Sequence, residues 1–277
     1  MTTVIKIGGA RAVDPAGAVA DIAERVDAGE RIVIVHGGST AVDDLLEALG
    51  ESPEYVTTPR GVTGRFTDEK TMEVFSMAMA GKVNTELTVT LQNAGVNAVG
   101  LSGVDGALMT GPRKSAVRVI EDGKKKIRRG DHSGRIETVN VELLETLLAG
   151  GYTPVISVPM LADDGVAVNA DADRAGAAVA AALGASLVLL TDVAGVYADP
   201  DDPASRIDTA TSPDDFDALE TAAEGFMTRK IMAAREALDG GATAVFIADG
   251  TRSNPVSQAL EGDATKITSG ALKGGAS

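Results

Sequence analysis

The sequence contains no cysteine, and this absence removes two kinds of chemistry. Disulfide bonds and thiolate metal sites cannot form, which is typical of a cytoplasmic protein. Only two histidines are present, His36 and His132, so a zinc site built on histidine is disfavoured. The apolar runs have the length of strands, too short to span a bilayer. The chain also enters its first strand directly, which leaves no room for a targeting peptide. We therefore expect a cytoplasmic protein with no membrane segment and no metal held by its own side chains.

Positive charge is also scarce. The 277 residues include 40 acidic and 25 basic side chains, for a net charge of −15. Nucleic acid is therefore disfavoured as a partner. Aspartate and alanine are abundant and lysine is scarcer than arginine, which resembles proteins of salt-loving organisms, although an ordinary acidic enzyme fits as well.

Strand-like and helix-like segments alternate along the chain, a pattern that predicts an α/β fold with a mostly parallel sheet between two helical layers. The expected strands cover residues 4–7, 31–35, 98–101, 153–157, 186–190 and 244–248. The expected helices cover residues 15–28, 40–49, 68–80, 82–94, 141–149, 173–183 and 227–239.

Shorter features complete the expected organisation. Asp122-Gly123 predicts a hairpin between residues 117–120 and 125–128. Ser39 or Thr40 is the expected N-cap of the second helix. Residues 200–213 are expected to form a loop and 273–277 a frayed tail. A change near residue 165 predicts two lobes, 1–165 and 166–277, with a substrate cleft between them.

Two strands of the first lobe end in paired glycines. The first contains Lys6 and ends in Gly8-Gly9, and the second ends in His36-Gly37-Gly38. One such pair is usually only a strand-to-helix turn. Two pairs at one sheet edge, with a lysine in the strand, favour a site where backbone N–H groups bind an anion.

The second half contributes three further motifs. They are Asn169-Ala170-Asp171-Ala172-Asp173, then Thr191-Asp192-Val193-Ala194-Gly195-Val196-Tyr197, and Met227-Thr228-Arg229-Lys230. Taken singly, they indicate a helix cap, a strand-to-loop transition and a solvent-facing lysine. Either Asp171 or Asp173 can be the functional acid at the start of the helix.

Together and in this order, the motifs resemble the amino acid kinase family, and most of all its acetylglutamate kinase branch. The blocks Ala80-Gly81-Lys82-Val83-Asn84 and Val99 to Gly106 resemble that branch too, so the likeness covers essentially the whole chain. No Walker A loop is present. The resemblance implies one amino acid kinase domain, residues 1–277, in which residues 1–165 bind the acyl acceptor and form a dimer and residues 166–277 bind ATP. It further implies ATP-dependent phosphorylation of a side-chain carboxylate, with Mg²⁺ held mainly by the ATP phosphates.

The resemblance also assigns roles to individual residues. The catalytic group is Lys6, Lys230 and Asp173, with Asp173 orienting both lysines. Gly8 and Gly9 bind phosphate. The substrate-binding group is Gly37, Gly38, Arg65 and Asn169. The nucleotide pocket is formed by Thr191, Asp192, Val193, Tyr197 and Met227. A carboxylate acceptor has a pKa of about 4.3 and is already ionised, so no catalytic base is needed.

Two features bear on the acceptor. The sequence Arg65-Phe66-Thr67-Asp68 resembles kinases that act on glutamate or α-aminoadipate attached to a small acidic amino-group carrier protein of the LysW type, in arginine and lysine biosynthesis. In addition, eight of the 25 basic residues lie between positions 113 and 129, on and beside the expected hairpin. Such a patch can bind an acidic carrier, or it can be a solvated surface without a partner.

Alternatives remain at this point. A plain N-acetylglutamate kinase acting on the free molecule is one, and a non-catalytic nucleotide-binding sensor of the same fold is another. The sensor is disfavoured because Lys6, Asp173 and Lys230 are all present. Arginine-inhibited members of the family carry an extra N-terminal helix that is not seen here, so we expect no such inhibition and a homodimer.

Overall fold

The computed structural model describes residues 2–8, 15–59, 61, 63–121 and 123–272. Gly9, Asp122 and the expected tail lie outside these ranges. Among the described residues, no helix has the length and hydropathy of a membrane span.

The centre of the molecule is a sheet whose main strands run parallel, as predicted. Its strand order is β13-β15-β14-β12-β1-β2-β10-β6-β9, with β5 and β11 also pairing with β10. The strands at the centre are β1 (Thr2–Ile7), β2 (Arg31–His36), β10 (Thr153–Ala162), β12 (Ser186–Thr191) and β14 (Ala244–Asp249). The flanking strands are β5 (Ala98–Gly103), β6 (Met109–Gly111), β9 (Thr138–Val139), β11 (Ala167–Val168), β13 (Thr209–Ala210) and β15 (Thr265–Thr268). Within this sheet, the antiparallel pairs of described strands lie at these flanks: β15 on β14, β9 on β6 and β11 on β10.

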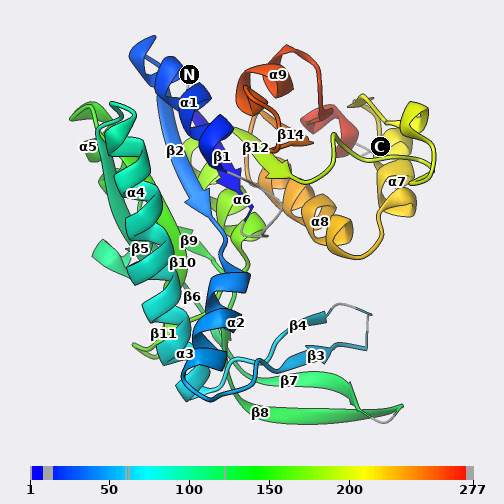
Figure 1. Cartoon of the computed structure of the whole chain (residues 1–277). Coiled ribbons are helices and arrows are strands. Elements are labelled where there is room, and N and C mark those ends of the chain that lie inside the picture. The colour runs from blue at the N-terminus through cyan, green and yellow to red at the C-terminus, as the bar shows by residue number, and fades with distance from the viewer. Residues whose placement is uncertain (1, 9–14, 60, 62, 122, 273–277) are drawn as a thin grey trace.

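Helices cover both faces of the sheet, which confirms the predicted three-layer arrangement (Figure 1). Successive residues of a strand point to opposite faces, so Val4 and Ile5 of β1 enter different cores. One core contains residues of α1 (Pro15–Asp27), α4 (Asn84–Asn93) and α9 (Pro255–Glu261). The other contains residues of α2 (Ser39–Ala48), α3 (Glu69–Ser76), α5 (Val141–Ala149), α6 (Ala172–Leu183), α7 (Pro213–Ala222) and α8 (Phe226–Asp239). By this alternation, Lys6 of β1 projects toward the layer that contains α6.

The two helices expected over residues 68–80 and 82–94 are in fact continuous. Between α3 and α4 the chain forms a π-helix, η1 (Met77–Val83), with no interruption. Gly81 lies inside this segment and does not break it, although a glycine in a helix weakens it. π-helical turns are often found at functional sites because they change the direction of the side chains that follow.

Helix ends correct the predictions in three places. Gly38, and not Ser39 or Thr40, is the N-cap of α2. Asp171 caps α6 by accepting hydrogen bonds from the backbone N–H groups of Asp173 and Arg174. The expected loop 200–213 contains η3 (Pro203–Ser205) and β13, and α7 begins at its last residue behind a capping box formed by Ser212 and Asp215.

Two hairpins project beyond the sheet. The first joins β3 (Tyr55–Thr57) to β4 (Thr63–Arg65), and the second joins β7 (Arg113–Glu121) to the long strand β8 (Lys124–Gly134). The second confirms the predicted hairpin, with longer strands than expected. Figure 1 shows both at the end of the molecule farthest from α1 and α9. The short 3₁₀ turns η2 (Asp105–Ala107) and η4 (Ser269–Leu272) complete the chain.

Candidate active site

The candidate site lies where the parallel strands β1, β2 and β12 end. Their register brings Lys6 beside Val35 on one side and Leu189 on the other. The carboxyl ends of parallel strands form the usual ligand-binding edge of an open α/β sheet. The predicted residues Lys6, Gly8, Gly37 and Thr191 therefore lie on or beside one edge.

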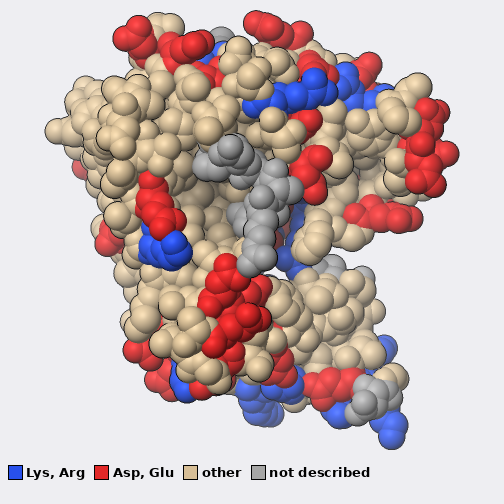
Figure 2. All heavy atoms as spheres, in the orientation of Figure 1, with Lys and Arg blue, Asp and Glu red and all other residues tan. Residues whose placement is uncertain are grey.

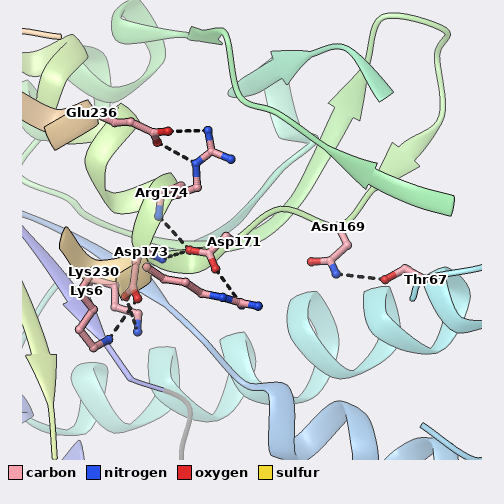
Figure 3. Close-up of polar contacts among 9 residues, drawn as sticks. Lys6, Thr67, Asn169, Asp171, Asp173, Arg174, Lys230 and Glu236 are labelled. Carbon is pink, nitrogen blue, oxygen red and sulfur yellow. Dashed lines mark hydrogen bonds and ion pairs between the residues drawn. The ribbon is translucent and has the colours of Figure 1, made fainter. Parts of the chain in front are cut away.

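Three charged side chains from distant parts of the chain meet at this edge. Lys6 Nζ lies 2.8 Å from Asp173 Oδ1, and Lys230 Nζ lies 3.1 Å from Asp173 Oδ2. Figure 3 shows the Asp173 carboxylate between the two ammonium groups. All three residues are buried, with exposed fractions of 6%, 7% and 8% for Lys6, Asp173 and Lys230. Helix α6 packs against β1 at this point, since a Cβ atom on Gly176 would lie in van der Waals contact with Lys6 Cβ, 3.4 Å away.

The electrostatics of this cluster follow from burial and charge. Burial raises the pKa of Asp173, but the charges of Lys6 and Lys230 outweigh it and hold the pKa at about 2. Burial, and next the charge of Lys6, lower the pKa of Lys230. The carboxylate is thus ionised, and two buried cations share one anion. The cluster therefore keeps one net positive charge at the sheet edge.

The two aspartates that the sequence left open occupy different places. Asp171 is the N-cap of α6, and only Asp173 contacts both lysines (Figure 3). Asp171 Oδ2 instead lies 3.4 Å from a guanidinium nitrogen of Arg229.

The second glycine pair is supported by a buried histidine that sequence reasoning did not place. His36 Nδ1 lies 2.9 Å from the carbonyl oxygen of Gly37, and its Nε2 lies 3.0 Å from Asn84 Nδ2. Asn84 Nδ2 also donates to the carbonyl oxygen of Val155 at 2.9 Å. Burial lowers the pKa of His36 to about 4, so the ring is neutral and donates through Nδ1. Asn84 directly follows the π-helix, which aims it at His36.

The Arg65 guanidinium forms hydrogen bonds and an ion pair with neighbouring residues of the chain. It forms an ion pair with Asp43 Oδ1 at 2.5 Å and donates to the Ser39 carbonyl oxygen at 3.1 Å and to the Tyr55 hydroxyl at 2.9 Å. Only 5% of its side chain is exposed. No sequence signal links Asp43 and Tyr55 to Arg65, because the contacts join α2, β3 and β4.

Asn169 contacts the segment that follows Arg65. Its Nδ2 donates to Thr67 Oγ1 at 3.1 Å, as Figure 3 shows. The Thr67 backbone N–H in turn donates to the buried carboxylate of Asp131 at 3.2 Å. Because Thr67 is fully buried, this chain of contacts fixes Asn169 relative to β8 and the start of α3.

The predicted nucleotide residues follow β12 and begin α8. Thr191 ends β12 and is 7% exposed, whereas 37% of Val193 is exposed. Tyr197 forms a β-bridge with Arg206, and Met227 lies in the first turn of α8 and packs partly against the core. Asp192 accepts a hydrogen bond from Thr191 Oγ1 at 3.1 Å. Phe226, which the sequence analysis missed, is 81% exposed beside Met227.

The second hairpin presents cations to solvent. Its register pairs Arg118 with Ile127, Ile120 with Lys125 and Ala116 with Arg129, so these six share one face. All six are exposed, and none of the three cations forms an ion pair with another described residue. The opposite face packs inward, where Val119 is fully buried and Arg128 lies 4.4 Å from the centre of the Phe66 ring. Figure 2 shows Lys and Arg along the edge where Figure 1 places β8, and a hollow between the hairpins and the half that carries α7 and α8.

The described residues contain no group of three or more histidine, aspartate or glutamate side chains arranged to hold a metal ion. Both carboxylate oxygens of Asp173 already face ammonium groups. The residues around the cluster thus suit a metal bound through a ligand's phosphates better than one bound by the protein.

Comparison with known proteins agrees with this geometry. Residues 1–249 match the amino acid kinase family. The chain is 46% identical to the [LysW]-aminoadipate kinase of Deinococcus radiodurans over 96% of this chain and 91% of that protein. It is 41% identical to the [LysW]-aminoadipate kinase of Thermus thermophilus over 95% and 99%, respectively. It is 40% identical to the acetylglutamate kinase of Methanopyrus kandleri over 86% and 91%.

A solved structure shows the same fold. The N-acetylglutamate synthase of Neisseria gonorrhoeae, complexed with coenzyme A and N-acetyl-glutamate, superposes with a TM-score of 0.74 at 27% identity. The comparison covers 96% of this chain and 59% of the synthase chain.

The chain therefore belongs to the amino acid kinase family. The predicted family, fold class and kinase activity are confirmed, and with the kinase comes the use of ATP. The sensor without turnover is correspondingly disfavoured.

Proposed function

We propose that the protein transfers the γ-phosphoryl group of ATP to the side-chain carboxylate of an amino-blocked glutamate or α-aminoadipate, giving an acyl phosphate. The acceptor is carried on a small acidic amino-group carrier protein of the LysW type, in arginine or lysine biosynthesis. The buried Lys6–Asp173–Lys230 cluster carries the proposal, because it concentrates positive charge at the ligand-binding edge.

The chemistry requires charge compensation more than proton transfer. The acceptor carboxylate is ionised at neutral pH and attacks without a base, but it approaches an anionic phosphoryl group. Lys6 and Lys230 offset this repulsion from two different elements, and Asp173 fixes both ammonium groups in place. Preorganised donors of this kind stabilise the charge that develops in a transition state.

The remaining roles are assigned by position. Backbone N–H groups of Gly8, and of Gly9 outside the described residues, bind phosphate, and that of Gly38 contacts the acceptor end. Gly37 lies beside it and shapes the acceptor end through its backbone, because its own N–H group donates to the Ile7 carbonyl oxygen at 3.0 Å. Arg65 and Asn169 bind the acceptor backbone. The nucleotide pocket consists of Thr191, Asp192, Val193, Tyr197 and Met227. Mg²⁺ is held through the ATP phosphates, where it neutralises their charge.

The carrier reading is supported by the exposed cationic face of the second hairpin, formed by Arg118, Lys125 and Arg129 around Ile120 and Ile127. The protein is otherwise strongly acidic, with a net charge of −15. An acidic carrier would be repelled by most of the surface and attracted to this face. The similarity to the [LysW]-aminoadipate kinases of Deinococcus and Thermus supports the same acceptor.

The proposal also includes the roles of the two lobes and the formation of a homodimer. Residues 1–165 form the acceptor-binding lobe and the contact of a homodimer, and residues 166–277 form the ATP-binding lobe. The exposed side chains of Met77 and Val89, on η1 and α4, support a contact in the first lobe. A cytoplasmic location follows from the pathway proposed.

The test is ATP-dependent acyl-phosphate formation, trapped as hydroxamate, with acceptors offered free and carrier-linked. We expect kcat/KM for carrier-linked glutamate or aminoadipate to exceed that for N-acetylglutamate at least 100-fold. Changing Arg118, Lys125 and Arg129 together to Glu should raise KM for the carrier-linked acceptor at least tenfold and leave KM for ATP unchanged. The matched control is Arg252→Glu, an exposed arginine beyond β14.

A second candidate is N-acetylglutamate kinase, which the 40% identity to the Methanopyrus acetylglutamate kinase favours. Equal or better use of free N-acetylglutamate, with no effect of the hairpin substitutions, would establish it and contradict the carrier reading.

A further inference from the structure

Arg229 lies close to two segments that are far from each other in the sequence, the start of α6 and strand β4. It lies on α8, directly before Lys230, and its Nη1 is 3.4 Å from Asp171 Oδ2 at the start of α6. Its Nη2 reaches β4, because a Cβ atom built on Gly64 would lie 3.4 Å away from that nitrogen. Gly64 precedes Arg65, so guanidinium groups from both halves approach the same strand.

The charge of Arg229 also reaches Tyr55, the residue that contacts Arg65. Burial and the hydrogen bond to Asp43 raise the pKa of Tyr55, and the charges of Arg65 and Arg229 both oppose this rise. The phenol therefore senses both arginines. Two guanidinium groups and two carboxylates, those of Asp43 and Asp171, balance one another in this part of the cleft.

The two arginines are held very differently. Arg65 has three polar partners at 2.5–3.1 Å and a side chain only 5% exposed. Arg229 has one polar partner among the described residues, Asp171 at 3.4 Å, and 26% of its side chain is exposed. An arginine whose only carboxylate contact is long can exchange that contact for a better one at small cost.

We propose that Arg229 is a second receptor for the acceptor carboxylate that is not phosphorylated, and that it leaves Asp171 to bind this group. The inference rests on the proposed function, in which an amino-blocked acidic amino acid retains a free α-carboxylate. A guanidinium group recognises a carboxylate through two parallel hydrogen bonds, which a lysine in its place does not reproduce. Because Lys230 is the next residue on the same helix, binding of the α-carboxylate by Arg229 also positions α8 for phosphoryl transfer.

The test compares each acceptor with its α-carboxamide, which keeps the reacting side-chain carboxylate but lacks the negative charge that Arg229 recognises. The probe is glutamate, carrier-linked or N-acetylated, whichever form the wild type uses with the higher kcat/KM. We expect the wild type to prefer the α-carboxylate about 10- to 100-fold, mainly through KM. Arg229→Gln should reduce this preference to threefold or less, with KM for ATP unchanged.

The control is Arg235→Gln, on the same helix, where the arginine pairs with Glu220 at 2.9 Å. This variant should keep the full preference. The inference is overturned if Arg229→Gln keeps the preference too, or if it lowers activity equally with both acceptors, as a purely structural role would. A wild type that phosphorylates no acceptor overturns the proposed function itself, and this inference with it.

Asp171→Asn tests the exchange separately. Asparagine caps a helix as well as aspartate does, so α6 is preserved, but the carboxylate that competes for Arg229 is gone. KM for the α-carboxylate acceptor should fall about two- to fivefold, while KM for the α-carboxamide stays the same. A higher KM for the α-carboxylate acceptor would contradict the exchange.

Discussion

Replacing Asp173 with asparagine tests the centre of the proposed mechanism. In the wild type this carboxylate lies within 2.8 Å and 3.1 Å of two buried ammonium groups. Asparagine keeps the shape and removes the charge, so two buried cations remain without an anion between them. The pKa of Lys230, already lowered by burial and by Lys6, should fall further, because the attraction of Asp173 that raises it is lost. One of the two lysines then releases its proton more easily than in the wild type.

The structure sets the size of the effect. The pKa of Asp173 falls from 3.8 to about 2, which corresponds to about 2 kcal/mol of native-state stabilisation. Leaving a buried charge without its partner typically costs about 3–5 kcal/mol. Set against a typical free energy of unfolding of about 5–15 kcal/mol, Asp173→Asn should fold but melt clearly below the wild type. Loss of the carboxylate that orients both ammonium groups, and of one ammonium donor at the phosphoryl group, should lower kcat about 10²- to 10³-fold.

The measurements are hydroxamate-trapped acyl phosphate for kcat and circular dichroism for the melting temperature. Asp217→Asn is the matched control, because Asp217 is exposed on α7 and should change neither quantity. A folded Asp173→Asn enzyme with kcat within threefold of the wild type would refute the reasoning. In the wild type, the depressed pKa of Asp173 means that its contribution to stability is complete above about pH 4 and is lost as the pH falls toward 2.

Two further predictions concern the His36 network. The pKa of His36 is lowered from 6.5 to about 4 in the folded protein, so the unfolded chain takes up a proton on this side chain at a higher pH than the folded protein does. The stabilisation that neutral His36 gives to the folded state is therefore lost as the pH falls from 6.5 to 4. Urea unfolding at pH 7.5 and at pH 5 should therefore show that the free energy of unfolding falls less in His36→Gln than in the wild type. An equal fall in both proteins would exclude His36 as the cause. A Cβ atom at Gly100 would lie 2.2 Å from Asn84 Oδ1, so Gly100→Ala should displace Asn84 and cost about 1–3 kcal/mol. Thermal denaturation checks this, and a melting temperature within 1 °C of the wild type would contradict it.

Periodicity and motif order predicted the sheet, most helices and the charged cluster. Local patterns suffice for these, because buried strands such as residues 187–190 are uniformly apolar and because Lys6 and Lys230 stand in recognisable motifs. The start of α7 is also marked in the sequence by Ser212-Pro213-Asp214-Asp215, but the expected loop 200–213 takes in Ser212 and Pro213 because proline, serine and aspartate are common in turns.

Contacts between distant segments could not be predicted. The π-helix depends on packing: a Cβ atom at Gly38 would lie only 2.7 Å from Met79 Sδ, so α2 and η1 fit together only without a side chain there. Likewise, the partners of Arg65 and Arg229 come from α2, β3 and α6. No spacing within one segment encodes these partners, because tertiary packing brings them together.

The place of β1 in the sheet has a consequence for synthesis of the chain. β1 pairs with β2 on one side and with β12 on the other, so its second neighbour is made only when residue 191 has been translated. At about 5–20 residues per second, the first strand waits roughly 10–40 seconds on the ribosome with one edge unpaired. The unpaired N–H and C=O groups of that edge can pair with other strands. β1 therefore lacks its second neighbour until β12 has been made, and the Lys6–Asp173–Lys230 cluster cannot form before residue 230 has emerged.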